Sequence, residues 1–253
     1  MGIKELSKKD FKNRFEMKKY ITIIKGDLQN IHRDPTLLLL LWVPLLVWAM
    51  CFFGLQVLSS FYPIIRGFYY PIIIFFALLV GIFPGITLSF ILLDEKDAQL
   101  LPVIKVTPVS LSGFLILRLL FMASLSFSFC LLLLMFNGVI HISMFQAVVI
   151  AFLSALNMPI LALITSTVAK NKVEGMTYLK VANVVVFLPT VAFFITSPWE
   201  YVLGIFPTFW VFQTADHWQT NAVCVRDAGI GILVLAGFNF LVFRYCLRKL
   251  ALL

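Results

Sequence analysis

Residues 67–93 read GFYYPIIIFFALLVGIFPGITLSFILL, and residues 94–97, which follow at once, read DEKD. The first stretch has no charged residue and exceeds the roughly 20 apolar residues that a helix needs to cross a bilayer. Irregular backbone cannot face hydrocarbon, so the charged residues and the segment after them are predicted to lie outside the bilayer. The pattern therefore predicts a membrane helix followed by a connection of residues 94–110.

This connection is too apolar for a merely solvated loop. Leu100, Leu101 and Ile104 lie among charged residues, a pattern typical of a short helix docked on another protein. We expect the connection to contact a partner. The alternative is an ordinary amphipathic connecting loop.

The composition indicates an integral membrane protein. The chain is 61% hydrophobic and 13% charged, with a mean hydropathy of +1.00, whereas a soluble domain has about 25% charged residues. Charge-poor windows long enough to span a bilayer recur along the chain, and Asn137-Gly138 marks a tight turn between two of them. We expect an all-α fold with six transmembrane helices in a domain of residues 35–250, at about 36–58, 68–93, 112–136, 144–168, 177–197 and 227–247.

The positions of Lys and Arg predict the orientation. Of 20 such residues, all but Arg66 and Arg226 fall in the N-terminal segment, residues 94–118, residues 170–180 or the C-terminal tail. Because Lys and Arg accumulate on the cytoplasmic side, we expect a multi-pass protein of the cell membrane with both termini cytoplasmic. The net charge of +8 then reflects topology, and we expect no nucleic-acid partner.

The N-terminal segment is amphipathic. Its apolar residues recur at spacings of three to five with lysines between them, which predicts a cytoplasmic helix within residues 1–34 that lies on the lipid surface. The alternative is a solvated tail. Charges throughout this segment leave no apolar core for a cleavable signal peptide. Asp34-Pro35 is predicted to be the N-cap and first residue of the first span.

The region before the last span is apolar but interrupted. Residues 199–214 include Gly204 and the run Phe206-Pro207-Thr208-Phe209-Trp210. We expect short re-entrant helices in the outer leaflet, because such backbone needs shielding by protein. Residues 216–227 are expected to form an exposed outer loop.

Four motifs occur in order among these spans. They are Arg33-Asp34-Pro35 with Pro44 inside the first span, Asp94-Glu95-Lys96 leading into Thr107-Pro108-Val109-Ser110, Lys170 to Gly175, and Pro207-Thr208-Phe209-Trp210. Together they resemble the ABC-2 type permease family, the membrane half of an ATP-binding-cassette exporter. The resemblance extends along nearly the whole chain.

The resemblance implies two permease copies, expected to be a homodimer, that carry two cytoplasmic ATPase subunits. The connection 94–110 would hold the coupling helix. We expect the ATPase interface to comprise Asp94, Glu95, Lys96, Asp97, Leu100, Leu101, Ile104, Lys172 and Glu174. For Glu174, pairing with Lys170 or Lys172 within the chain is the alternative.

The chain is not expected to be an enzyme. It has no G-x-x-x-x-G-K-[ST] phosphate loop, so ATP and Mg²⁺ are expected on the partner ATPase. The four cysteines form no CxxC pair, and we expect neither a cofactor nor a metal site in this chain. Arg118 and Lys180, near the cytoplasmic ends of spans, are expected to snorkel to the interface.

Polar residues inside the spans are candidates to line a pathway. They are Asn157, Asn183 and Asn239, although such residues often hold helices together instead. The apolar walls suit a hydrophobic or amphipathic cargo, such as a drug, a peptide or a lipid-like molecule. Two alternatives are a non-transporting immunity or sensor protein and a secondary carrier. The interiors of the spans lack carboxylates, with Asp227 at the boundary of the last one, which disfavours the carrier.

Overall fold

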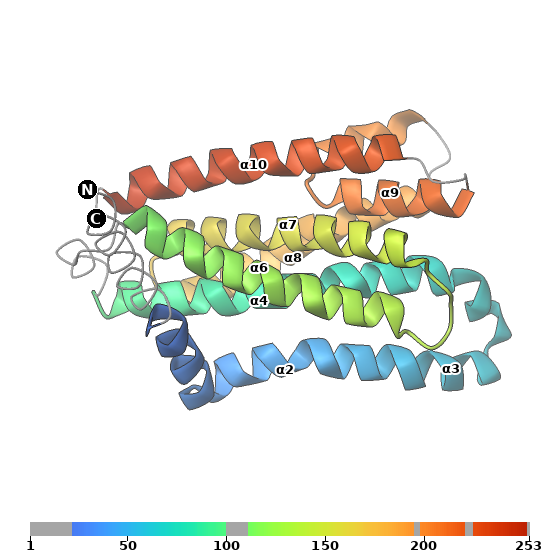
Figure 1. Cartoon of the computed structure of the whole chain (residues 1–253), viewed down its shortest axis with the longest axis horizontal. Coiled ribbons are helices and arrows are strands. Elements are labelled where there is room, and N and C mark those ends of the chain that lie inside the picture. The colour runs from blue at the N-terminus through green and yellow to red at the C-terminus, as the bar shows by residue number, and fades with distance from the viewer. Residues whose placement is uncertain (1–21, 100–110, 195–197, 221–224, 252–253) are drawn as a thin grey trace, which may run out of the picture.

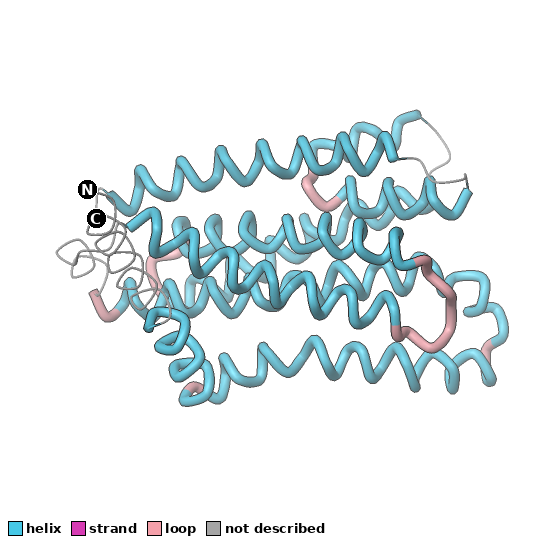
Figure 2. The backbone as a smooth tube through the Cα atoms, in the orientation of Figure 1, coloured by secondary structure: helices cyan, strands magenta, loops and turns pink. Residues whose placement is uncertain are grey.

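The computed structural model describes residues 22–99, 111–194, 198–220 and 225–251. Within these ranges the chain forms helices joined by short loops, without a strand (Figure 2). The long helices run side by side in one bundle (Figure 1). This arrangement confirms the all-α class.

The bundle begins with a helix over residues 22–33, which is turned away from the axis of the next helix (Figure 1). The later elements are α2 (Pro35–Ala49), the π-helical segment η1 (Met50–Gly54), α3 (Leu55–Phe61), the 3₁₀ segment η2 (Pro63–Phe68), α4 (Tyr69–Asp97), α6 (Leu111–Met135), α7 (Met144–Val168), α8 (Lys172–Phe187), the 3₁₀ segments η3 (Leu188–Phe194) and η4 (Pro198–Ile205), α9 (Phe209–Thr220) and α10 (Val225–Ala251).

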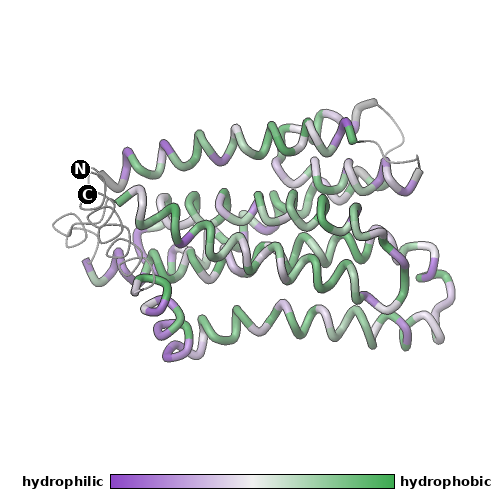
Figure 3. The backbone as a smooth tube through the Cα atoms, viewed as in Figure 1, coloured by the Kyte–Doolittle hydropathy of each residue, from purple (hydrophilic) through white to green (hydrophobic). Residues whose placement is uncertain are grey.

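Five helical stretches among the described residues are long and apolar enough to cross a membrane. They are Pro35–Phe61, Pro63–Asp97, Leu111–Met135, Met144–Val168 and Val225–Lys249. Their apolar lengths and the polar ends of the bundle are visible in Figure 3. These stretches agree with five of the six expected spans and confirm a multi-pass membrane protein.

The expected span 177–197 is not among the five. α8 has 16 residues, and its α-helix gives way to 3₁₀ geometry at Leu188, directly before Pro189. Pro189 donates no N–H and so cannot continue the i to i−4 hydrogen bonds of the α-helix, although Leu188 before it keeps α dihedral angles. The segment is therefore divided into α8 and η3 instead of forming one long α-helix.

The N-terminus of α2 is built as predicted. Asp34 is its N-cap, and its Oδ1 accepts a hydrogen bond of 2.8 Å from the Thr36 N–H. Pro35 takes the first helical position, where its missing N–H costs no hydrogen bond. The cap fixes where helix 22–33 ends and the first membrane helix begins.

The turn between α6 and α7 also matches the prediction. Gly138 has φ +76°, a conformation that glycine adopts readily. The Asn137 side chain accepts hydrogen bonds from the Val139 and Ile140 N–H groups. Gln56 on α3 donates to the Gly138 carbonyl at 3.0 Å, so the turn is held against the end of the first membrane helix.

α4 forms the centre of the bundle, with a nearly continuous buried stretch from Val80 to Leu93. Two glycines allow this close packing. A Cβ atom at Gly81 would lie 2.7 Å from the Cys130 Sγ of α6, and one at Gly85 would lie 2.8 Å from the Met158 carbonyl oxygen of α7. Small residues let membrane helices approach closely, so the backbone of α4 contacts side chains of α6 and both the backbone and a side chain of α7.

The two ends of the bundle can be told apart by their contacts. The starts of α2 and α8 meet the ends of α4, α7 and α10 at what we call the charged end, which holds Asp34, Lys96, Arg118 and Lys172. At the opposite end, which we call the far end, the Tyr70 hydroxyl of α4 donates to the Ala215 carbonyl of α9 at 2.8 Å. α7 ends at the charged end and α9 lies at the far end. The segment between them, α8 with η3 and η4, therefore leads from one end of the bundle to the other.

Short helices follow η3, as expected for residues 199–214. η4 and α9 are joined by a turn in which the Thr208 hydroxyl donates to the Val186 carbonyl at 2.8 Å. The expectation of an exposed loop over residues 216–227 is wrong. α9 continues to Thr220, and Trp218 and Asp227 are buried, because His217 on α9 bonds Asp227 on α10 at 2.7 Å.

Candidate functional site

A buried group of charges at the charged end centres on Arg118, in the second turn of α6. Its guanidinium donates two hydrogen bonds of 2.6 Å to the carboxylate of Glu95 on α4, and a third to Asp27 of helix 22–33. Arg118 is 4% exposed and Asp27 is 1% exposed. Bidentate Arg–carboxylate pairs fix geometry as well as charge, so the pairing holds helix 22–33 and α4 against α6.

The expectation that Arg118 snorkels to water is therefore wrong. Helix 22–33 and α4 cover the start of α6 and supply carboxylates to the Nη1 and Nη2 atoms of the guanidinium, whereas its Nε atom is buried without a hydrogen-bond partner among the described residues. Burial raises the pKa of Asp27 to about 6, although the Arg118 charge lowers it in part. The Asp27 Oδ2 atom has no hydrogen-bond partner among the described residues.

A second ion-pair group surrounds Lys172 at the start of α8. Its ammonium lies 3.1 Å from Asp34 Oδ2 and 2.9 Å from Asp94 Oδ2. Asp34 caps α2 and Asp94 belongs to the last turn of α4. One lysine therefore connects three elements at the charged end.

The remaining charges of the DEKD run also bond within the chain. The Lys96 ammonium donates to the Ala169 carbonyl, the C-cap of α7, at 2.7 Å, which suits the negative end of that helix. The Asp97 carboxylate accepts a 3.3 Å hydrogen bond from the Lys172 backbone N–H. All four residues from Asp94 to Asp97 therefore position neighbouring helices.

Glu174 also bonds locally. Its carboxylate accepts hydrogen bonds from the Lys170 backbone N–H at 2.8 Å and from the Tyr178 hydroxyl at 3.2 Å. Its partners are thus not the Lys170 or Lys172 ammonium groups. Leu100, Leu101 and Ile104 lie outside the described residues, so their contact with a partner stays a prediction.

Comparison with known proteins identifies the family. The family model for "Fluoroquinolones export permease protein Rv2686c-like" matches residues 27–243, which include every charged residue of the two ion-pair groups above. The chain belongs to this family of export permeases. This agrees with the resemblance found in the sequence motifs.

Two curated relatives of this permease come from Mycobacterium tuberculosis. They are "Fluoroquinolones export permease protein MT2760" of strain CDC 1551 / Oshkosh and "Fluoroquinolones export permease protein Rv2686c" of strain ATCC 25618 / H37Rv. Each is 26% identical to the permease over 209 residues, which cover 76% of this chain and 81% of the relative. No solved structure matches the chain significantly.

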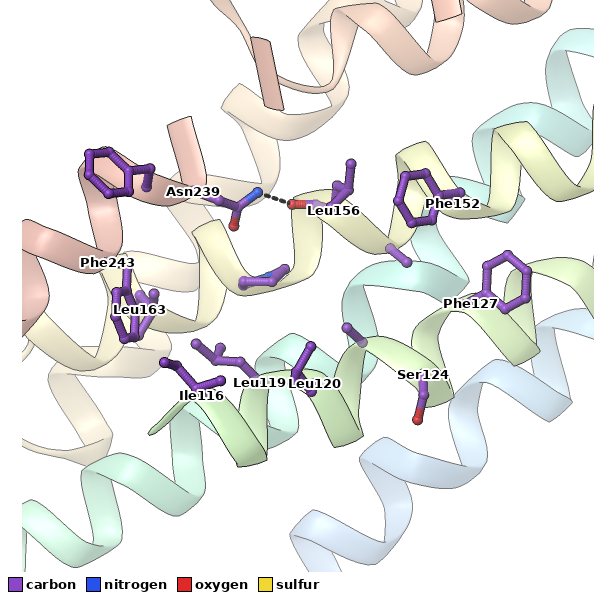
Figure 4. Close-up of a pocket in the computed structure, with 14 residues that line it drawn as sticks. Ile116, Leu119, Leu120, Ser124, Phe127, Phe152, Leu156, Leu163, Asn239 and Phe243 are labelled. Atoms are coloured by element: carbon purple, nitrogen blue, oxygen red, sulfur yellow. Dashed lines mark hydrogen bonds between the residues drawn. The ribbon is translucent and has the colours of Figure 1, made fainter. Parts of the chain in front are cut away.

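A wide apolar groove lies between α6, α7 and α10 of the permease, with a volume of about 610 Å³. Figure 4 shows its walls, which are almost entirely apolar and include several phenylalanines. Asn239 of α10 lies in this groove and donates a 2.8 Å hydrogen bond to the Leu156 carbonyl of α7. The predicted pathway residue Asn239 thus also joins two helices.

The other predicted pathway residues lie elsewhere. Asn157 lines a second pocket of about 410 Å³ between α7, α8 and α10, and donates to the Leu153 carbonyl of its own helix. Asn183 on α8 lines neither cavity. Among the described residues, no group of three or more His, Cys, Asp and Glu side chains could hold a metal ion. The role of the three asparagines in a pathway stays a prediction.

Asp27 is the functional candidate that the sequence analysis missed. It lies between Ile24 and Ile31 at helical spacing, on the apolar stripe of an otherwise conventional amphipathic helix. An acid on such a stripe signals a buried partner, because a lone buried charge is costly. The partner, Arg118, is too distant in sequence to be found from that signal.

Proposed function

We propose that this permease is the membrane subunit of an ATP-driven exporter, in which a separate ATP-binding-cassette ATPase docks at the charged end. The observation that carries the proposal is that residues Asp94 to Asp97, where the connection 94–110 begins, all bond to neighbouring helices. Family membership supports export, and the ion-pair groups supply a mechanical link from the connection to the helices.

The ion pairs and hydrogen bonds connect the end of α4 to several helices at once. Glu95 contacts α6 through Arg118, Asp94 contacts the starts of α2 and α8 through Lys172, and Lys96 contacts the end of α7. Charge-assisted hydrogen bonds are short and directional. A displacement that the ATPase imposes on the connection is therefore passed to four other helices together, as transmission into a packed bundle requires.

Within this mechanism, Leu100, Leu101 and Ile104 enter an apolar groove of the ATPase. Apolar anchors buried at an interface supply most of its binding energy, whereas rim charges add little. We expect Asp94, Glu95 and Lys96 at the rim of that contact, with Glu174 also at the interface. ATP and Mg²⁺ are bound and turned over by the ATPase.

We also propose six membrane crossings with both termini in the cytoplasm. α2 starts and α10 ends at the charged end, which requires an even number of passages through the bundle. α8 and η3 together hold 23 residues, 16 in α8 and 7 in η3, and at about 1.5 Å and 2.0 Å per residue they span roughly 38 Å. This is enough to cross hydrocarbon of about 30 Å, with η4 and α9 as re-entrant helices.

Two copies of the permease with two ATPases form the working complex in this proposal. The cargo is an amphipathic molecule with a large apolar part, consistent with the apolar walls of both cavities. The fluoroquinolones in the names of the relatives belong to this chemical class, and a drug of that kind is the cargo we propose.

The test is a Leu101→Ala, Ile104→Ala double variant, assayed for ATPase pull-down and for cargo-stimulated ATP turnover. Each truncated anchor is expected to cost roughly 2 kcal/mol of interface energy, so pull-down should fall sharply. Ile64→Ala is the matched control, because this side chain is 78% exposed near the far end. Binding and turnover like wild type in the double variant would show that the connection is an ordinary loop.

A further inference from the structure

The groove between α6, α7 and α10 opens sideways. All three helices belong to stretches long and apolar enough to cross a membrane, and Leu120 and Phe240 at its walls are 65% and 58% exposed. The walls are almost entirely apolar, so they offer few partners for water. Apolar space that is left empty forfeits dispersion contacts. In a bilayer, the molecule best suited to fill the groove is therefore a hydrocarbon chain.

The groove is about as long as one leaflet is thick. Along α6 its lining runs from Ile116 to Phe127, which is roughly 16 Å at about 1.5 Å per residue. Half of a hydrocarbon core of about 30 Å is roughly 15 Å. Figure 4 shows Ile116 and Phe243 at one end of the groove and Phe127 and Phe152 at the other. Because α6 begins and α10 ends at the charged end, the first of these groove ends is the one nearer to it.

Two arginines continue from the groove along α10. Phe240, Arg244 and Arg248 follow one another at four-residue spacing, which places them on one side of the helix. The Cζ atom of Arg244 lies 5.7 Å from the centre of the Phe240 ring, which is part of the groove wall. Both arginines are exposed, and neither forms an ion pair with a carboxylate among the described residues. Two positive charges without an acidic partner therefore lie just beyond the groove, on the side of the charged end.

We propose that the groove and these arginines bind an anionic phospholipid, with one acyl chain in the groove and the phosphate on Arg244 and Arg248. The chain packs on apolar walls that include Leu120 and Phe240. Guanidinium groups match phosphate oxygens in a bidentate geometry, and basic residues next to a membrane helix attract anionic lipids. This site goes beyond the proposed function and needs no ATPase. Cargo that enters the groove from the bilayer would displace the chain.

The experiment titrates the full-length permease, purified in nonionic micelles, with three probes. They are phosphatidylglycerol, phosphatidylcholine with the same acyl chains, and glycerol phosphate, which carries the phosphate without a chain. Phosphatidylglycerol should bind at least about fivefold more tightly than phosphatidylcholine, the effect of one basic residue at an anionic headgroup. Glycerol phosphate should neither bind measurably nor displace phosphatidylglycerol, because it has no chain to fill the groove.

Variants separate the two parts of the site. Arg244→Gln should lower the affinity for phosphatidylglycerol about fivefold and leave that for phosphatidylcholine unchanged. Arg33→Gln is the matched control, because Arg33 is an exposed arginine at the same end of the bundle but on helix 22–33, and it should bind both lipids like wild type. Ala123→Phe fills the groove from α6 without changing a charge, so both phospholipids should lose about tenfold in affinity. Leu120→Trp, at an exposed position of the same wall, replaces that variant if its unfolding temperature falls below that of wild type.

Equal affinity of wild type for the two phospholipids would overturn the inference. Equal losses in Arg244→Gln and Arg33→Gln would also overturn it, because they would reflect only a general attraction of the charged end for anionic lipids. Binding of glycerol phosphate as tight as that of phosphatidylglycerol would leave a phosphate site in which the groove has no part. Unchanged lipid binding in a folded groove-filling variant would place the chain elsewhere. Each of these results leaves the docking of an ATPase to its own test.

Discussion

At the scale of single residues, Arg118 is the centre of the buried ion-pair group. Its single positive charge pairs with the carboxylates of both Glu95 and Asp27, and all three side chains are largely buried. Removing one member of a buried ion pair strands the others and typically costs about 3–5 kcal/mol. We predict a loss of this size for Arg118→Leu, measured by thermal or denaturant unfolding in detergent micelles.

Arg248→Leu serves as the control for this prediction, because Arg248 is exposed near the end of α10. Surface charges contribute about 0–1 kcal/mol, so its unfolding should be close to wild type. Equal stability of the two variants would contradict the buried ion-pair group.

The raised pKa of Asp27 predicts that the stability of the folded protein falls as the pH rises. Burial raises the pKa of Asp27 to about 6 in the folded protein, above the roughly 3.9 of an unfolded chain. The folded state therefore holds the proton more tightly, and stability from this group is complete below pH of about 4 and lost as pH rises through about 6. Asp27→Asn has no such titration.

The measurement is the unfolding temperature of the wild type and of Asp27→Asn between pH 4 and pH 8. Wild type should lose stability relative to Asp27→Asn across pH 4 to 6, by at most about 3 kcal/mol at 1.4 kcal/mol per pKa unit. A constant difference between the two proteins over this range would rule out a raised pKa.

Local signals in the sequence located the Asp34 cap and the Asn137-Gly138 turn, because both depend on residues adjacent in the chain. The pairing of Asp27 with Arg118 could not be found in that way, since it depends on how α6 packs against helix 22–33. The same limit applies to Lys172, whose partners Asp34 and Asp94 are brought together only by the fold.

At the scale of elements, the packing of α4 rests on Gly85. A Cβ atom there would come 2.8 Å from the Met158 carbonyl oxygen and 2.9 Å from Met158 Cγ, so Gly85→Ala must separate α4 from α7. We predict a loss of about 1–3 kcal/mol, the usual cost of overpacking. Gly237→Ala in α10 is the matched control.

No atom lies within 4 Å of a Cβ placed on Gly237, so alanine there should be neutral or stabilise the helix by up to about 1 kcal/mol. Unfolding in detergent distinguishes the two variants. A stability loss in Gly237→Ala as large as in Gly85→Ala would point to intrinsic helix effects instead of close approach.

The proposed crossing by α8 and η3 is the hardest of the six to recognise from hydropathy. Lys180 interrupts the apolar pattern and Pro189 divides the segment, so the helix is shorter than the sequence suggested. Likewise, the boundaries of α9 depend on the contact between His217 and Asp227. This contact joins two helices and could not be predicted from the local sequence. The five other spans were predictable because a long apolar run in a bilayer has few alternatives to a helix.

Single-cysteine labelling tests this crossing in a background without Cys51, Cys130, Cys224 and Cys246. Val173→Cys lies near the start of α8 and Tyr201→Cys lies in η4, and both native side chains are at least half exposed. In intact cells, an impermeant reagent should label position 201 and not position 173. Labelling of both positions from outside would place the start and end of the segment on one side.

At the scale of the whole molecule, the charged end, the bundle and the groove form one mechanical unit. The ion-pair groups join Asp94, Glu95 and Lys96, in the last turn of α4, to α2, α6, α7 and α8, and two of these helices, α6 and α7, form walls of the groove. Movement at the charged end can therefore change the shape of the groove. This is the physical route by which ATP turnover would control cargo binding.

The central claim is that a separate ATPase drives this permease from its charged end. The most direct measurement is the native mass of the permease purified together with its candidate ATPase from a neighbouring gene, with and without a nonhydrolysable ATP analogue. We predict a complex of two permeases and two ATPases whose permease-stimulated ATP turnover requires both proteins. A stable permease that never retains an ATPase, and an ATPase whose turnover ignores the permease, would contradict the account.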